Sequence, residues 1–375
     1  MNNLLIKSDN LTALKLLLSE RNMAAKIDLV YIDPPFATGG NFTITNGRAS
    51  TISNSKHGAV AYSDKLLGND FLQFLRARFE LLRDLLSPQG SIYVHIDYKI
   101  GHYVKILMDE VFGIAHFRND ISRIKCNPKN FKRIAYGNVK DMILFYSKSA
   151  SPIWNEPKTK YTDQDIKVLF PKVDSAGRRY TTVPIHAPGE TLNGNSNKQF
   201  KGLKPPQGRH WRTDVDTLDK WDREGLIEWS SNGNPRKKIF AEEQEGKRVQ
   251  DVWEFKDPQY PDYPTEKNAD MLDLIIKTSS NENSIVLDCF CGSGTTLVAS
   301  QKNNRQWIGI DQSDMAIQAT RKKLASMDLD LFCSTVNYEY VELDTFEIKA
   351  LDDNSILTMD AANNLVNHNI TTAVK

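Results

Sequence analysis

The sequence predicts an α/β fold in which one parallel sheet is assembled from both ends of the chain. Strand-length apolar runs alternate with segments of helical spacing up to about residue 149, and the alternation returns at residue 263. Such alternation is typical of parallel α/β units. In between it stops, and prolines, glycines, tryptophans and charged residues intermix. The 375 residues suit two domains, and we expect four segments: 1–149, 150–262, 263–326 and 327–375.

Apolar runs that stop at an acid or at prolines indicate the strands, and leucines and phenylalanines at helical spacing indicate the helices. In the first segment we expect strands at 4–9, 27–33, 90–97 and 141–148, and helices at 11–18, 70–86 and 102–112. In the third we expect strands at 284–290 and 306–311, and helices at 269–279, 295–302 and 314–325. Residues 37–62 are rich in Gly, Ser, Thr and Asn without periodicity, which predicts a long mobile loop. The pattern weakens after residue 326.

Composition excludes several classes of protein. Hydrophobic residues make up 40% and charged residues 25%, which rules out a disordered, collagen-like or disulfide-stapled chain. No apolar run reaches the roughly 18 residues of a membrane span, and the first residues lack a signal-peptide pattern. The four cysteines form no CxxC pair and no cluster with zinc-ligand spacing. We therefore expect reduced thiols, no bound metal, no membrane partner and a cytoplasmic protein.

The formal net charge of +1 conceals an uneven distribution. Residues 118–148 contain eight basic residues and two acids, whereas residues 326–375 contain nine acids and two lysines. A basic middle and an acidic tail can mark binding surfaces, although solvated faces give the same pattern. The net charge itself therefore says nothing about nucleic acid binding, and the basic middle is the segment to consider for it.

The first chemical motif is a glycine turn, DCFCGSGTT at 288–296, which follows a predicted strand and opens a helix. Glycines let the backbone turn sharply and approach a ligand, and the N–H groups of a helix start favour a polar or negative group. The turn lacks the Lys-Ser/Thr of a phosphate-binding loop and the third glycine of a dinucleotide fingerprint. Asp311 ends the next strand, where an acid can accept hydrogen bonds from ribose hydroxyls. A purely structural turn is the alternative.

The second motif is Asp33-Pro34-Pro35-Phe36, at the end of the strand IDLVYID. The prolines hold the segment rigid and lack N–H groups, which leaves nearby carbonyl oxygens open to a substrate. A carboxylate, an open carbonyl and an aromatic ring at one strand end suit a planar exocyclic amine. Asp33 and the Pro34 carbonyl would accept its two N–H groups while Phe36 stacks on the ring. The alternative is a proline-rich turn with a helix-capping aspartate.

Together the two motifs resemble those of the amino-methylating DNA methyltransferases that use S-adenosylmethionine. DPPF before FCGSG resembles the beta arrangement of that family, and KSDNL, YPTEKN and WIGID agree with it. The resemblance covers about residues 1–150 and 255–325. It departs at Cys289, where the family usually has proline, and at Phe36, which replaces the commoner tyrosine. It implies a Rossmann-like methyltransferase sheet with a circularly permuted motif order and an inserted, smaller target-recognition region at 150–262.

The resemblance implies roles for individual residues. The residues of the glycine turn would line the methionine side of the cofactor. Asp311 would hold the ribose, and Asp9 would approach the adenine ring of the cofactor unless it caps the following helix. Thr265 and Lys267 would meet the methionine carboxylate, for which a hydroxyl and a cation are suited. The implied cofactor residues are Asp9, Asp288, Phe290, Gly292, Gly294, Thr295, Thr296, Asp311, Thr265 and Lys267.

The implied reaction is methylation of the exocyclic amine of a flipped base in duplex DNA. Hydrogen bonds from the amine to Asp33 and to the Pro34 carbonyl would draw its nitrogen toward a tetrahedral shape. Asp before the two prolines favours adenine N6 over cytosine N4 by family habit, although the physics does not decide between two exocyclic amines. A cysteine nucleophile is not expected, because Cys289 and Cys291 both belong to the cofactor turn and no Pro-Cys motif is present.

We expect DNA contacts from basic residues of the middle region. Phosphate contacts would position the duplex, and arginines or polar side chains would contact base edges. For Trp211, Trp221, Trp229 and Trp253 we prefer core packing. The candidate DNA-binding residues are Arg118, Arg123, Lys125, Lys129, Lys132, Arg133, Arg209, Arg212, Arg236, Lys237 and Lys238.

Several alternatives stay open. The enzyme could methylate cytosine N4, an RNA or a protein amide, or the chain could be a catalytically silent DNA-binding subunit. A nicotinamide-dependent dehydrogenase is disfavoured by the missing third glycine. The resemblance suggests the modification enzyme of a restriction–modification system. It leaves open a cognate endonuclease and a homodimer as partners, and gives no function for the acidic tail.

Overall fold

The computed structural model describes residues 2–34, 41–45, 48–49, 59–63, 68–128, 132, 134–191, 194–258, 266–327 and 336–343. The chain divides into two compact units, of which the second comprises residues 158–249 and the first the chain on either side of it. The second unit is shorter at both ends than the expected insertion at 150–262. Residues 150–157 and 250–258 belong to the first unit.

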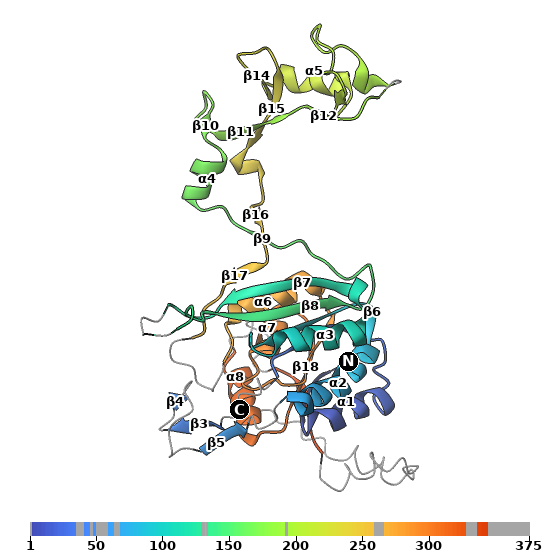
Figure 1. Ribbon diagram of the computed structural model, residues 1–375, viewed down its shortest axis with the longest axis vertical. Coiled ribbons are helices and arrows are strands. Elements are labelled where there is room, and N and C mark those ends of the chain that lie inside the picture. The colour runs from blue at the N-terminus through green and yellow to red at the C-terminus, as the bar shows by residue number, and fades with distance from the viewer. Residues whose placement is uncertain are drawn as a thin grey trace. The chain divides into compact units, whose positions relative to one another are not determined.

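The first unit contains a nine-stranded sheet in the described part of the chain, with the order β17-β7-β8-β6-β2-β18-β19-β1-β20. Its strands β7 and β8 lie side by side in Figure 1. Both ends of the chain contribute to it, as predicted. The strands, in this order, are Val252–Glu254, Phe117–Ile124, Lys140–Ser147, Leu86–Ile96, Ile27–Ile32, Ile285–Asp288, Gln306–Asp311, Asn3–Lys7 and Tyr338–Glu342.

The expectation of an entirely parallel sheet was wrong, because β8 runs antiparallel to both of its neighbours, β6 and β7. Sequence analysis also missed β7, β17 and β20. In β7 five of the eight residues are polar or charged, and β17 has only three residues. The edge strand β20 pairs with β1 in parallel, so part of the expected acidic extension 327–375 belongs to the sheet.

Helices cover both faces of this sheet. On one face α1 (Asn10–Ser19), α2 (Gly68–Leu85) and α3 (Gly101–Phe112) pack over the larger apolar core. The opposite face carries α7 (Thr295–Lys302) and α8 (Asp314–Ala325), which enclose a smaller core around Leu297, Trp307 and Ile317. The remaining helices of this unit are α6 (Ala269–Ser279), which packs against α7, and the short η1 (Ile114–His116).

Part of the segment 37–62, expected as one long loop, forms strands. β3 (Asn41–Thr45) pairs in antiparallel fashion with β4 (Arg48–Ala49) and β5 (Ala59–Ser63). β-Branched and aromatic residues in NFTIT and AVAYS favour strands, and the surrounding serines and glycines hid that signal. The other residues of this segment lie outside the described part of the chain.

The second unit has a small antiparallel sheet, β10-β11-β15-β14, and two strand pairs, β12-β13 and β16-β9. Its core contains Trp211 and Phe200, so the predicted core packing of Trp211 is confirmed, whereas Trp229 is 40% exposed and stacks on Phe200. Its elements are β9 (Lys158–Thr159), α4 (Asp163–Leu169), β10 (Lys172–Val173), β11 (Arg179–Pro184), β12 (His186–Pro188), η2 (Asn195–Asn197), β13 (Arg209–Trp211), α5 (Val215–Arg223), β14 (Ile227–Trp229), β15 (Pro235–Phe240), η3 (Ala241–Glu243) and β16 (Lys247–Arg248).

No helix among the described residues is both long and apolar enough to cross a membrane.

Candidate functional site

The predicted site residues of both motifs follow neighbouring parallel strands of the first unit. β2, β18, β19 and β1 lie side by side in parallel, and Asp33, Asp288, Asp311 and Asp9 stand at or just after their carboxyl ends. In open α/β sheets this edge is where ligands bind. The two motifs, separated by more than 250 residues in the sequence, therefore meet at one edge of the sheet.

The glycine turn is fastened to α8 and to the end of β19. Asp311 accepts hydrogen bonds from the Gly292 N–H at 2.9 Å and from the Ser313 N–H at 2.9 Å, and Thr320 Oγ1 donates to the Gly292 carbonyl at 2.9 Å. Gly294 has a φ of 75°, and a Cβ there would lie 2.7 Å from Thr320 Oγ1. Only glycine fits this position, because both the backbone angle and the neighbour exclude a side chain.

Asp288 holds the turn from within. Its carboxylate accepts hydrogen bonds from the Phe290 N–H at 3.0 Å and from Thr296 Oγ1 at 2.6 Å. Burial raises the pKa of Asp288 to about 7, against the opposing effect of these two hydrogen bonds. Asp288 and Thr296 therefore shape the turn, which leaves the N–H groups at the start of α7 without a capping side chain.

The structure adds a lysine and a glutamate that sequence reasoning missed. Lys323 on α8 pairs with Glu266 and donates hydrogen bonds to Ser293 Oγ at 2.9 Å and to Thr295 Oγ1 at 3.2 Å. Lys323 lies in the last turn of α8, an ordinary amphipathic helix, and nothing in its spacing along the sequence distinguishes it from its neighbours. A cation and an anion are thus placed together beside the glycine turn.

Asp9 caps α1, the alternative role considered for it. It accepts hydrogen bonds from the N–H groups of Leu11 and Thr12 and pairs with Arg78 at 3.1 Å. Next to it, Asn10 Nδ2 donates to the Cys289 carbonyl at 2.9 Å, which ties the start of α1 to the glycine turn. A role of Asp9 at the cofactor's adenine ring stays a prediction.

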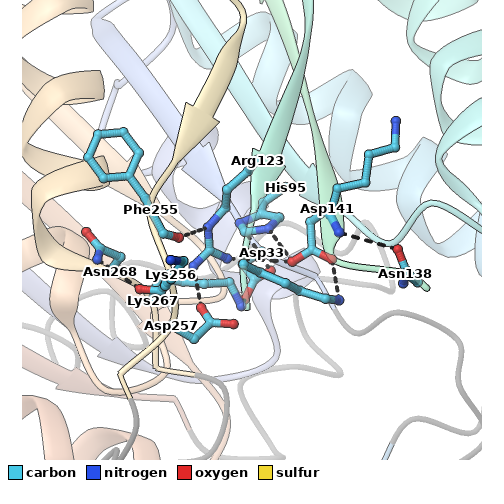
Figure 2. Close-up of polar contacts among 12 residues, drawn as sticks. Asp33, His95, Arg123, Asn138, Asp141, Phe255, Lys256, Asp257, Lys267 and Asn268 are labelled. Carbon is cyan, nitrogen blue, oxygen red and sulfur yellow. Dashed lines mark hydrogen bonds and ion pairs between the residues drawn. The ribbon is translucent and has the colours of Figure 1, made fainter. Parts of the chain in front are cut away.

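Lys267 lies against one carboxylate oxygen of Asp33 (Figure 2), and the other oxygen accepts no hydrogen bond from the described residues. Lys267 Nζ pairs with Oδ2, whereas Oδ1 is buried and has no hydrogen-bond partner in the described part of the chain. Lys267, expected at the methionine carboxylate, is therefore placed on the carboxylate of the DPPF motif. A buried acceptor without a donor is costly, so this oxygen is available to a ligand N–H. Pro34 is buried beside it, and Pro35, Phe36 and Thr265 lie outside the described residues.

A buried polar network lies behind Asp33 (Figure 2). His95 on β6 accepts or donates through both ring nitrogens, with Tyr31 Oη 3.0 Å from Nδ1 and Asp141 Oδ2 3.2 Å from Nε2. Asp141 on β8 also pairs with Lys125 at 2.5 Å and lies 3.6 Å from Arg123. Nothing in the spacing of these residues along the sequence indicates that they meet.

The network overturns part of the expected DNA-binding set. Arg123 is fully buried, pairs with Asp257 and donates to the Phe255 carbonyl at 2.8 Å, so its assignment to DNA was wrong. Lys125 is engaged by Asp141 in the same network. Arg118 donates to Ser147 Oγ and to the Ser149 carbonyl within the first unit. Successive side chains of β7 point to opposite faces of the sheet, so some of its basic residues point into the protein. A count of charges along the sequence does not reveal this. Lys132 is exposed, and Lys129 and Arg133 lie outside the described residues.

The remaining candidates lie in the second unit. Arg209 Nη1 lies 3.1 Å from His186 Nδ1, and Arg212 Nε donates to the His186 carbonyl at 3.3 Å. Burial lowers the pKa of His186, and the nearby charges of Arg209, Arg212 and Arg236 lower it further. Lys237 and Lys238 instead lie over the rings of Trp221 and Tyr180. We call Arg209, Arg212 and Arg236 the arginine cluster.

The cysteines of the glycine turn are unsuited to nucleophilic chemistry. Cys289 and Cys291 are buried, and burial raises the pKa of both thiols far above the ordinary value. Because the thiolate is the reactive form, these side chains pack as small apolar groups.

Comparison with known proteins identifies the family. A family model for N6/N4 methyltransferases, described as DNA methylase, matches residues 27–322. The type II methyltransferase M.EcaI of Enterobacter cloacae is 40% identical over 329 residues, which cover 86% of this chain and 69% of that protein. The chain belongs to the N6/N4 family of DNA methylases. S-Adenosylmethionine, expected from the motifs, is the methyl donor of this family.

Other relatives of this DNA methylase are longer or more distant. The probable type III restriction–modification enzyme HindVI Mod subunit of Haemophilus influenzae is 25% identical over 401 residues, covering 85% of this chain and 50% of that protein. The type II methyltransferase M1.MboII of Moraxella bovis is 36% identical over 256 residues, covering 65% of this chain and 76% of that protein. The chain thus spans about half of the type III subunit.

The glycine turn of this methylase suits S-adenosylmethionine on its own chemistry. The cradle at Gly294 admits no side chain, the start of α7 offers uncapped N–H groups, and the Lys323–Glu266 pair supplies both signs of charge for an amino acid moiety. Which residues contact the cofactor stays a prediction.

Proposed function

We propose that this DNA methylase transfers a methyl group from S-adenosylmethionine to the exocyclic N6 amine of adenine in duplex DNA. The observation that supports this most is the open Oδ1 of Asp33, a buried acceptor at the strand end next to the glycine turn. Such an acceptor fits the N–H of an exocyclic amine. Adenine is preferred to cytosine because Asp precedes the two prolines, the habit of the adenine enzymes that the motif resembles.

The protein's own residues would act by binding and orientation. Bound S-adenosylmethionine supplies an electrophilic methyl group. Asp33 Oδ1 and the Pro34 carbonyl accept the two N–H groups of a base that has left the stack, and the nitrogen lone pair is thereby drawn out of conjugation with the ring. Lys267 keeps the Asp33 carboxylate in place through Oδ2. Positioning and electrostatics supply the catalysis, and no covalent enzyme intermediate is needed.

The second unit is proposed to contact the DNA. It contains 18 Lys and Arg against 13 Asp and Glu, a net charge of +5, and it carries the arginine cluster. Phosphate contacts draw on such charge. We further propose that the chain is the modification enzyme of a bacterial restriction–modification system in the cytoplasm, in keeping with the names of its relatives. A cognate endonuclease and a homodimer belong to the same proposal.

Methylation of unmodified genomic DNA by the purified protein, followed by single-molecule sequencing, tests the proposal. We expect N6-methyladenine in one short sequence context. N4-methylcytosine would contradict the adenine assignment. Absence of modification in DNA, despite measured binding of S-adenosylmethionine, would contradict DNA as the substrate and would direct the assay to RNA and protein amides.

The Asp33→Ala variant tests the role of the carboxylate. We expect methyl transfer to fall by about a thousandfold or more, since an acceptor that orients the reacting amine is lost, while cofactor binding measured by calorimetry is retained. The control is Asp120→Ala, which removes an exposed aspartate on β7 and should leave the rate unchanged. Substantial transfer by Asp33→Ala would contradict the mechanism.

A further inference from the structure

The polar network behind Asp33 has a high desolvation cost for a group of residues with a purely structural role. His95 and Arg123 are completely buried, and Asp141 is nearly so. Ionised groups in such a place cost several kcal/mol unless they are paired, and apolar packing is often the more stable alternative. The network lies directly behind the carboxylate proposed to hold the target amine, and His95 Nδ1 lies 4.0 Å from Asp33 Oδ1.

The surroundings of His95 determine where its hydrogen lies. Asp141 receives Lys125 on one oxygen and faces Arg123 and His95 with the other. Burial opposes its ionisation, but the partners outweigh burial and hold the pKa of Asp141 well below the ordinary range. The ionised carboxylate can only accept, so His95 Nε2 carries a hydrogen. Burial also lowers the pKa of His95, against the effect of Asp141, so the ring is neutral and Nδ1 is bare.

The bare Nδ1 has a partner in Tyr31. The Tyr31 hydroxyl lies 3.0 Å from Nδ1, and because that nitrogen has no hydrogen the hydroxyl must be the donor. Burial, reinforced by the charge of Asp33, raises the pKa of Tyr31, so the hydroxyl keeps its proton. Side chains two residues apart along a strand point to the same face, and the charge of Asp33 acts on the Tyr31 hydroxyl, so without Nδ1 we expect this hydroxyl to turn toward Asp33.

We propose that His95 is a positioning residue that keeps competing donors away from Asp33 Oδ1. Asp141 fixes the hydrogen of His95 on Nε2, and the bare Nδ1 holds the Tyr31 hydroxyl, so neither group donates to Asp33. Lys267 occupies the other oxygen, and Oδ1 stays open for the target amine. This inference rests on the proposed function of Asp33.

The position of the hydrogen is tested directly on the full-length wild-type protein labelled with ¹⁵N-histidine. Nuclear magnetic resonance at neutral pH should show His95 as a neutral ring with the hydrogen on Nε2. The signal is assigned as the one that shifts in Tyr31→Phe, which removes the hydrogen bond to Nδ1. A cationic ring or a hydrogen on Nδ1 would overturn the inference. This measurement does not depend on methyl transfer.

Kinetics of His95→Leu, Tyr31→Phe and the double variant test the consequence for Asp33. Leucine has neither an acceptor for the Tyr31 hydroxyl nor a donor of its own. We expect His95→Leu to lower kcat at least tenfold with KM for DNA within twofold, because the Tyr31 hydroxyl is released toward Asp33. Tyr31→Phe alone should stay close to wild type, and adding it to His95→Leu should restore kcat several-fold. A structural role alone predicts that the double variant is slower than His95→Leu, and that result would overturn the inference.

The two experiments separate this inference from the proposed function. Absence of transfer by the wild-type protein on any DNA contradicts the proposed function. An active wild-type protein whose double variant fails to recover contradicts only the role of His95. Calorimetric binding of S-adenosylmethionine confirms that each variant is folded before its kcat is compared.

Discussion

Each strand-end carboxylate has a different environment, and Asp288 has the most unusual one. Its pKa of about 7 lies above the ordinary value of 3.8, so between these pH values the folded protein binds a proton that the unfolded chain has lost. Stability from this group is therefore greatest below about pH 4 and is lost as the pH rises through 7. The Asp33 carboxylate, by contrast, is paired with the ammonium group of Lys267.

The Asp288→Asn variant should expose this dependence. The amide cannot titrate, and its NH₂ group meets either the Thr296 hydroxyl or the Phe290 N–H, so we expect a loss of about 1 to 3 kcal/mol at pH 5. The loss should shrink as the pH rises to 8, because only the wild-type protein is destabilised by that rise. Urea unfolding at both pH values measures it, with Asp120→Asn as the exposed control. A loss that grows with pH would contradict the buried, protonated carboxyl.

At the scale of single residues, the sequence was most informative where local chemistry alone defines a role. Glycines in a strand-to-helix turn and an acid before two prolines need no distant partner to be recognised, and the glycine turn and Asp33 both follow strands, as predicted. Arg123 and Lys125 show the limit, since counting charges made them candidates for DNA. Their partners, the buried Asp141 on β8 and the exposed Asp257 after β17, meet them only in the folded sheet.

At the scale of elements, strands buried on both faces were predicted well. β2 and β18 are predominantly apolar, as is typical of strands that helices cover on both faces of the sheet. The strands that were missed lack this signal: β20 is a half-exposed edge strand and β7 is polar along half of its length. The antiparallel direction of β8 could not be predicted, because its apolar run is the same in either direction.

The turn between β18 and α7 depends on the closeness of α8. For Gly294→Ala we expect a loss of about 2 to 4 kcal/mol, made up of a left-handed alanine and a clash with Thr320, together with weakened binding of S-adenosylmethionine. Gly233→Ala is the matched control, since its φ of 72° is similar but no atom lies within 4 Å of the added Cβ. Thermal unfolding and calorimetry measure both effects. Equal losses in the two variants would show that backbone strain, and not the contact with α8, determines the cost.

At the scale of the whole molecule, the two units use their basic residues differently. The first unit uses much of its basic segment internally, in the network around Asp141 and in the hydrogen bonds of Arg118. The second unit is inserted between two short paired strands, β9 and β16, and keeps exposed arginines at the β12–β13 pair. The overall net charge of +1 conceals this difference, which is why composition alone gave no indication of nucleic acid.

If the arginine cluster contacts phosphates, its loss must reduce the salt dependence of DNA binding and not only the affinity. For the double variant Arg209→Gln/Arg212→Gln we expect the slope of log K against log salt to fall by about 2, since each phosphate contact contributes about 0.9. Fluorescence anisotropy with duplex DNA across a salt series measures it. The control, Lys160→Gln/Lys220→Gln, removes the same charge from exposed positions of the same unit outside the cluster. Equal changes in the two pairs would mean that the unit attracts DNA by its total charge, whereas an unchanged slope in both would contradict phosphate contacts by the arginine cluster.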